Sequence, residues 1–151
     1  MVRRHSPLLP APAALRPSAH HLVPAPAGYL YHQKDMLQDR GRMDGYRNAI
    51  LQNPDCFKDK VVLDVGTGSG VLAIWAAMAG AKRVYAIEAT SMAQQARRLI
   101  SQNGFQDTIT VIEGYMEQVE LPEKVDIIVS EWMGCDRQRA SAPHELARLF
   151  S

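Results

Sequence analysis

A glycine-rich stretch, VLDVGTGSG at positions 62–70, holds the residue types best suited to bind a small molecule. Three glycines alternate directly after an apolar run that contains the acidic Asp64. Glycine is needed where the backbone turns tightly or approaches a ligand, because no Cβ atom intrudes. A second acidic residue, Glu88, ends the next apolar run, and its carboxylate could accept hydrogen bonds from two vicinal hydroxyl groups. In a parallel sheet these residues would share the carboxyl edge, where such folds bind nucleotides.

The spacing of the glycines separates three classes of nucleotide site. A dinucleotide fingerprint, GxGxxG, would need glycine at position 71, where the chain has Val71. A phosphate-binding P-loop would need lysine followed by serine or threonine, and that pair does not follow the loop. The GxGxG pattern after an acidic strand residue instead favours S-adenosylmethionine (SAM), which has no phosphate and needs only close backbone approach. The alternative is a purely structural glycine turn, because short motifs produce false matches.

Hydrophobic patterning predicts the elements that position this loop. Short apolar runs predict four buried strands, at residues 61–65, 83–87, 108–112 and 125–129. Helical spacing predicts helices over residues 69–79 and from Met92 to a cap at Gly104, with Leu99 on the apolar face. An earlier helix, stopped by Asn53-Pro54, is predicted from one apolar face that consists of Met36, Met43, Tyr46 and Ile50. Strands that alternate with helices predict an α/β fold with a parallel sheet.

Composition excludes several other classes of protein. The chain has 151 residues, with 17 basic and 16 acidic, and this balance excludes a strongly basic nucleic-acid binder. Its two cysteines form neither a CxxC pair nor a disulfide framework, which favours a reducing compartment. The longest apolar run, residues 71–81, is about half of a membrane span, so we expect no membrane-spanning segment. We also expect no metal site.

Residues 1–28 differ sharply from the rest of the chain. They contain six of the nine prolines, and no acidic residue occurs before Asp35. Proline at this density blocks helix and strand alike, so we expect the segment to be disordered. A basic, alanine-rich, acid-free segment is also compatible with an organelle transit peptide, but its prolines disagree with the amphipathic helix that such peptides form. We therefore expect a cytoplasmic or nuclear protein.

Two stretches, VLDVGTGSGVLAIWAAMAGAKRVYAIEAT and VDIIVSEWMG, resemble the SAM-binding half of protein arginine methyltransferases, with wording closest to the plant-specific branch. The preceding YHQKDMLQDRGRM resembles that family's N-terminal helix, and SEWMG is a specific signature. The resemblance covers roughly residues 29–134 and implies an incomplete Rossmann-like class I methyltransferase core with four parallel strands in the order 3-2-1-4. It also implies methyl transfer from SAM to arginines of histones or other proteins. A small-molecule methyltransferase of the same fold is an alternative against which SEWMG argues.

The resemblance assigns roles to individual residues around the cofactor. Arg42 would pair with the carboxylate of SAM, although from the residues alone an i, i+3 ion pair with Asp39 is an equal alternative. Glu88 would take the ribose, and Glu117 would accept from the adenine amino group. The full set of implied cofactor-binding residues is Gln33, Met36, Arg42, Asp64, Gly66, Gly68, Glu88, Met116 and Glu117.

Glu131 is the catalytic candidate that the resemblance implies. It would be the first of two glutamates that hold the guanidinium group of the substrate, whose charge is permanent, and that orient one nitrogen for attack. Asp39 would support the site. The second glutamate would fall at position 140, where the chain has Ala140. We therefore expect the isolated chain to lack turnover.

Both ends of the chain depart abruptly from the family pattern, which suggests a truncated, alternatively spliced or mispredicted product. The alternative function is then a non-catalytic form that binds SAM or a full-length family member. Residues 135–151 form a divergent tail, with either a short helix at 144–150 or a frayed terminus. A strand at 125–130 would be left as an apolar sheet edge, so we expect marginal stability and a tendency to associate.

Overall fold

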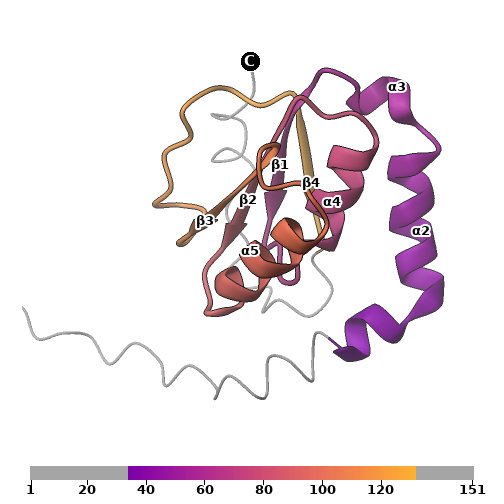
Figure 1. Cartoon of the computed structure of the whole chain (residues 1–151), viewed down its shortest axis with the longest axis horizontal. Helices are drawn as coiled ribbons and strands as arrows, with labels where there is room; N and C mark the ends of the chain where they lie inside the picture. Colours follow the sequence, from indigo (N-terminus) through magenta and orange to yellow (C-terminus); the bar gives the residue numbers. More distant parts are fainter. Residues whose placement is uncertain (1–33, 132–151) are drawn as a thin grey trace, which may run out of the picture.

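The computed structural model describes residues 34–131. Residues 34–38 are helical, and the following elements are α2 Arg40–Leu51, α3 Pro54–Phe57, β1 Val61–Val65, α4 Val71–Met78, β2 Arg83–Glu88, α5 Met92–Gln102, β3 Ile109–Glu113 and β4 Ile127–Ser130. Figure 1 shows the strands at the centre, with α4 and α5 in front of them and α2 to one side. The predictions for residues 1–28 and 135–151 lie outside the described residues.

The four strands form one parallel sheet in the order β3-β2-β1-β4, which confirms the predicted order. In the middle of β1, Leu63 lies opposite Tyr85 of β2 and Ile128 of β4. Parallel strands are usually covered on both faces and are therefore rich in valine and isoleucine, as VVLDV and IIVS are. Because the strands run in one direction, their carboxyl ends meet at one edge of the sheet. That edge carries the glycine loop and Glu131.

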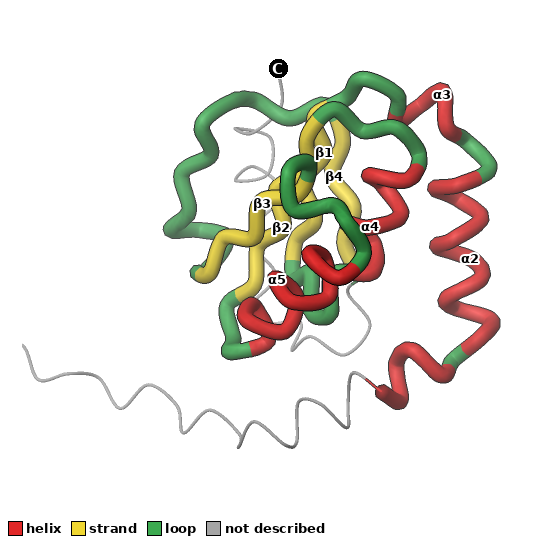
Figure 2. Tube along the Cα trace, viewed as in Figure 1, coloured by secondary structure: helices red, strands yellow, loops and turns green. Residues whose placement is uncertain are grey.

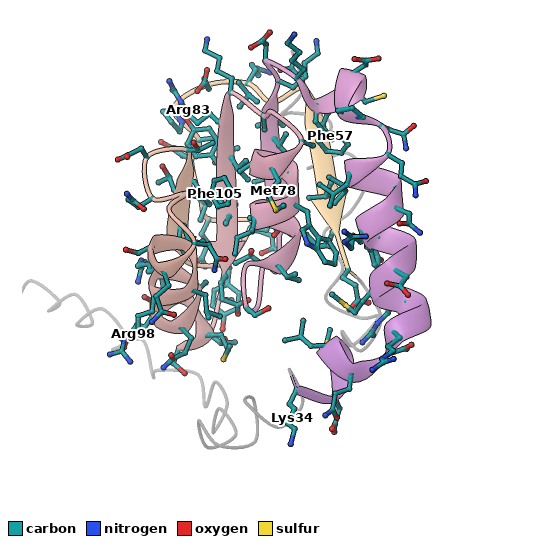
Figure 3. All side chains as sticks on the ribbon, turned by 45° about the vertical axis from the view of Figure 1, so that its right-hand side comes forward. Lys34, Phe57, Met78, Arg83, Arg98 and Phe105 are labelled. Carbon is teal, nitrogen blue, oxygen red and sulfur yellow. The ribbon has the colours of Figure 1, made fainter. Side chains whose placement is uncertain are left out.

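One face of the sheet is covered by the helices. Its strand residues, such as Val62 and Ala86, are fully buried against α4 and α5. The alanines of α4, Ala73 and Ala76, are small enough to let this helix approach the sheet closely, and both are fully buried. Phe57 of α3 belongs to the same cluster, whereas Met78 lies on the outer side of α4 (Figure 3). This packing fixes the position of the loop between β1 and α4.

The opposite face of the sheet has a different cover. Leu63, Tyr85 and Ile87 form its buried centre, and side chains from residues 116–121 pack against them. Figure 2 shows residues 114–126 as a long loop that joins β3 to β4. Among the residues that the structure describes, no helix lies on this face. The loop therefore covers this face of the sheet, as the helices cover the other face.

The first predicted helix is interrupted, which corrects the single helix expected around residues 36–50. Asp39 has non-helical backbone angles, with φ −72° and ψ 87°, and its side chain accepts a hydrogen bond from the Arg42 N–H at 3.3 Å. Aspartate favours such capping because its short carboxylate competes for backbone donors. The predicted apolar face persists, since Met43 and Tyr46 are half-buried and Ile50 is buried.

Three smaller predictions also need correction. A short helix, α3, follows Asn53, because proline at position 54 fits the first turn of a helix as well as it ends one. Leu99 was expected on the apolar face of α5 but is 39% exposed. The last strand begins at Ile127, two residues later than expected. The Asp126 N–H still donates to the Val61 carbonyl at 2.8 Å, but the Val61 N–H donates to the carboxylate of Asp126, also at 2.8 Å, so a side chain replaces a backbone acceptor here.

Candidate cofactor-binding site

The glycine loop follows β1 directly and has left-handed backbone at each of its glycines. Gly66, Gly68 and Gly70 have φ values of 71°, 55° and 86°, which other residues adopt only with strain. The N–H groups of Gly66 and Thr67 both donate to the carbonyl of Ile87 at 2.9 Å, so the loop is tied to the end of β2. A Cβ atom added at Gly66 would meet no atom within 4 Å. The backbone at this position therefore faces open space.

Asp64 lies beneath the loop. Its Oδ2 accepts from the Thr67 hydroxyl at 2.6 Å and from the Ala73 N–H at 3.1 Å, which joins the loop to the first turn of α4. The residue is 1% exposed, and its Oδ1 is buried without a hydrogen-bond partner among the described residues. Burial raises the pKa of Asp64 from 3.8 to about 7, and its hydrogen bonds to Thr67 and Ala73 oppose that rise. Asp64 thus shapes the loop and does not present its carboxylate to solvent.

Glu88 holds the other side of the loop. Its Oε2 accepts from the Gly68 N–H at 2.9 Å, and its Oε1 accepts from the N–H and the hydroxyl of Thr90 at 3.0 and 2.7 Å. A carboxylate offers about four acceptor positions, so three hydrogen bonds leave about one. Acceptance from two vicinal hydroxyls would therefore require one of the present hydrogen bonds to be exchanged. This contact places Gly68 directly against Glu88, two of the residues that the resemblance assigns to the cofactor.

Thr90 is a site residue that the sequence did not reveal. Its hydroxyl donates to Glu88 and accepts from the N–H of Met92 at 3.2 Å, so it links the carboxylate to the start of α5. The available signal was a threonine two residues after the acid at a helix start, a position where hydroxyl groups commonly bind the local backbone.

Arg42 and Glu131 meet at the opposite end of this edge. One guanidinium nitrogen of Arg42, Nη1, lies 3.3 Å from Oε2 of Glu131, and Nη2 donates to the carbonyl of Met36 at 2.7 Å. The alternative partner, Asp39, is 3.8 Å from Nε, too far for a hydrogen bond. Nε itself is buried without a hydrogen-bond partner in the described part of the chain. The structure therefore brings together Met36, Asp39, Arg42 and Glu131, four of the predicted site residues.

Tyr46 belongs to this corner, although its spacing indicated only helix packing. Its hydroxyl donates to the Ser130 carbonyl at 3.5 Å, next to Glu131. Burial raises the pKa of Tyr46, the negative charge of Glu131 raises it further, and the guanidinium of Arg42 opposes both. The pKa of this hydroxyl therefore depends on both charges of the Arg42–Glu131 ion pair.

Two of the remaining predicted residues, Met116 and Glu117, lie after β3. The Gly114 N–H donates to the Glu88 carbonyl at 2.9 Å, which holds the start of this segment to the same sheet edge. Met116 is half-buried against the strands, while Glu117 is exposed and makes no hydrogen bond or ion pair within residues 34–131. The structure does not join Glu117 to the other site residues, and Gln33 lies outside the described residues.

The described residues contain neither of two further kinds of site. Within residues 34–131, no three side chains of His, Cys, Asp or Glu are grouped so as to hold a metal ion. No helix in that part of the chain is both long and apolar enough to cross a membrane.

Known proteins match this chain over most of the described region. A family model described as ribosomal protein L11 methyltransferase (PrmA) matches residues 50–133. Protein arginine N-methyltransferase PRMT10 of Arabidopsis thaliana is 62% identical over 106 residues, which are 70% of this chain and 28% of the relative. The histone-arginine methyltransferase CARMER of Drosophila mojavensis is 56% identical over 107 residues, 71% of this chain and 20% of that protein. The chain thus spans less than a third of the length of these curated relatives.

Solved structures agree with the sequence matches. The crystal structure of Arabidopsis thaliana protein arginine methyltransferase 10 has a TM-score of 0.69 and 61% identity, and the match covers 72% of this chain and 32% of that one. The Trypanosoma brucei PRMT1 enzyme-prozyme heterotetrameric complex with AdoHcy has a TM-score of 0.67 and 49% identity, covering 71% and 34%. The family model matches more than half of the chain, so the chain belongs to this family of methyltransferases, and the relatives that are 49–62% identical to it are protein arginine methyltransferases.

Proposed function

We propose that residues 34–131 form the SAM-binding part of a protein arginine N-methyltransferase. The observation that carries this proposal is the glycine loop, whose left-handed backbone is held between Asp64 and Glu88. Such a loop offers close backbone approach without a phosphate site. The relatives support the choice of ligand, since the Trypanosoma brucei structure contains AdoHcy.

The groups of SAM fit the polar atoms that the site offers. Gly66 faces open space, so a ligand can approach its backbone. Nε of Arg42 is a buried donor that makes no hydrogen bond among the described residues, which suits the carboxylate of the amino-acid end. Glu88 retains acceptor capacity for a ribose hydroxyl, and Met116 and Glu117 would bind the adenine, as the family resemblance implies. When bound, SAM supplies a methyl group activated by its sulfonium charge.

Glu131 would act on the second substrate. Its carboxylate would bind the guanidinium group of a protein arginine, orient one nitrogen and offset the positive charge. This role needs a second carboxylate, and Ala140 occupies the predicted position. We therefore propose that this chain binds the cofactor without turning over substrate.

The substrate and location follow from the family. We propose arginines of histones or other proteins as the methyl acceptors of the whole enzyme, since one relative is a histone-arginine methyltransferase. A cytoplasmic or nuclear location suits such substrates.

A second candidate function is association with a full-length family member. Within the described residues, β4 is hydrogen-bonded to β1 alone, so it lies at the sheet edge. A strand edge with apolar side chains favours pairing with another chain. The Trypanosoma brucei relative forms a heterotetramer of enzyme and prozyme, a precedent for such assembly. Co-elution of this chain with a full-length relative in size-exclusion chromatography would support the proposal, and separate elution at micromolar concentrations would contradict it.

Calorimetric titration with SAM tests the principal proposal. Gly66→Ala introduces a Cβ into the open space above the loop, so we expect affinity to fall by about tenfold or more at a folding cost near 1 kcal/mol. Gly104→Ala is the matched control, because Gly104 also has a left-handed φ, 78°, and open space at its Cβ, but it follows α5, outside the loop. It should lower stability while its folded fraction keeps its affinity for SAM.

Two outcomes would contradict the proposal. Absence of SAM binding in a folded wild-type sample would remove the cofactor role. Transfer of labelled methyl from SAM to a histone peptide, lost in Glu131→Gln, would show that the chain is active despite Ala140.

A further inference from the structure

We propose that Arg42 is shared between Glu131 and the carboxylate of the cofactor, so that the charge of Glu131 opposes cofactor binding. This inference rests on the proposed function, because it assigns SAM to the same site. It concerns how the two substrates of that site influence each other. The family resemblance assigns Arg42 and Glu131 to different substrates, whereas the structure pairs them.

The guanidinium of Arg42 is held from two sides. Nη2 donates to the Met36 carbonyl at 2.7 Å, and Nη1 lies 3.3 Å from Glu131. The side chains of Arg42 and Glu131 are only 16% and 12% exposed, so water screens this ion pair less than a surface pair. Arg42 therefore has a fixed place with its charge directed at Glu131.

One N–H of the guanidinium makes no hydrogen bond within the described residues. Arginine has five N–H donors in a rigid fork, and Nε of Arg42 is buried without a hydrogen bond among the described residues. Asp39 approaches that nitrogen only to 3.8 Å and is largely exposed. A ligand carboxylate could bind the Nε side without displacing Glu131 from Nη1. The geometry thus allows two carboxylates on one cation.

Sharing has an electrostatic consequence. With both carboxylates in place, one positive charge faces two negative charges, and the two carboxylates repel each other. The charge of Glu131 then weakens the binding of a cofactor that carries a carboxylate. A substrate guanidinium on Glu131 would add a second positive charge and remove this penalty. The two substrates would therefore support each other through Arg42.

The test compares two ligands that differ by the carboxylate alone, SAM and its decarboxylated analogue. Calorimetry gives the dissociation constant of each for the full chain and for Glu131→Gln. Neutralising Glu131 should raise the preference for SAM over the analogue by about threefold to tenfold, and high salt should reduce this gain. Taking the ratio removes effects of Glu131 on the sulfonium and amino groups that both ligands carry.

Two variants complete the experiment. Glu113→Gln is the matched control, because Glu113 also ends a strand but pairs with Arg97 of α5 at 3.3 Å, and it should leave the ratio unchanged. Arg42→Gln removes the shared cation and should lower the preference for SAM about tenfold or more. Thermal melting establishes that each variant is folded.

Three outcomes would overturn the inference. An unchanged ratio in Glu131→Gln would show that the two carboxylates do not share Arg42. A lower ratio in that variant would show that Glu131 only orients Arg42 for the cofactor. Failure of the folded wild-type chain to bind either ligand would remove the proposed function and this inference with it, whereas the first two outcomes leave SAM binding intact.

Discussion

The carboxylates at the two ends of the candidate site are held in different ways. On the loop side, Asp64 and Glu88 are almost fully buried and bind backbone N–H groups and hydroxyls. At the other end, Glu131 faces Arg42 across an ion pair that joins α2 to the end of β4. The loop contacts connect neighbouring segments of chain, whereas the nearby Tyr46–Ser130 hydrogen bond spans 84 positions.

This difference indicates which end can respond to a ligand. Buried carboxylates with backbone partners cannot move without leaving donors unsatisfied, so the loop side acts as a rigid cradle. Glu131 faces the charged side chain of Arg42, and an ion pair of this kind can exchange one charged partner for another. The loop side should therefore govern stability, and the Arg42–Glu131 corner should govern ligand preference.

The largest expected effect tests the loop side through pH. The pKa of Asp64 in the folded protein is about 7, above its ordinary 3.8, so the folded state binds this proton more tightly than the unfolded state. The free energy of unfolding of the wild type should then fall as pH rises from about 4 to about 7, by roughly 4 kcal/mol. Asp64→Asn does not titrate, so its stability relative to wild type should rise by that amount over the same window.

Denaturant unfolding at several pH values measures this difference. The exposed Asp107→Asn variant controls for the loss of one carboxylate. Parallel pH profiles for wild type and Asp64→Asn would show that the buried carboxylate does not govern loop stability.

A smaller effect tests the link between Glu88 and α5. Thr90→Val removes the hydroxyl that donates to Glu88 and accepts from the Met92 N–H. We expect a loss of about 1–2 kcal/mol in the free energy of unfolding, whereas Thr90→Ser, which keeps the hydroxyl, should lose less than about 0.5 kcal/mol. Equal losses in the two variants would assign the effect to packing instead of hydrogen bonding.

The smallest effect is expected at the corner. Tyr46→Phe removes a long hydrogen bond of 3.5 Å, so unfolding should change by less than about 0.5 kcal/mol. Because Glu131 raises the pKa of Tyr46, Glu131→Gln should lower it. Absorbance titration at alkaline pH measures the pKa of Tyr46, when the titration of the matching Tyr46→Phe variant is subtracted. If Tyr46→Phe lost as much stability as Thr90→Val, the loop side would not be the end of the site that governs stability.

Much of the fold was predictable because its signals are local. The runs VVLDV and VDIIV predicted strands, and the three alternating glycines predicted a turn between strand and helix. The predicted helix and strand boundaries were wrong where one side chain changed the local backbone, as Asp39 does by capping α2. Leu99 has helical spacing with its neighbours but faces solvent, because packing against the sheet selects a narrower face than spacing predicts.

The glycine loop, the acidic residues beside it and the resemblance to arginine methyltransferases can be recognised from the amino-acid sequence alone. These features depend on residue type and short spacing, which any chain shows directly. The partners of the carboxylates, in contrast, depend on how the chain folds. Asp64 lies beneath the loop and accepts from Thr67. Glu88 accepts three hydrogen bonds from Gly68 and Thr90, and Glu131 forms an ion pair with Arg42. Such partners come from segments that are brought together by sheet order and burial, which spacing along the chain cannot specify.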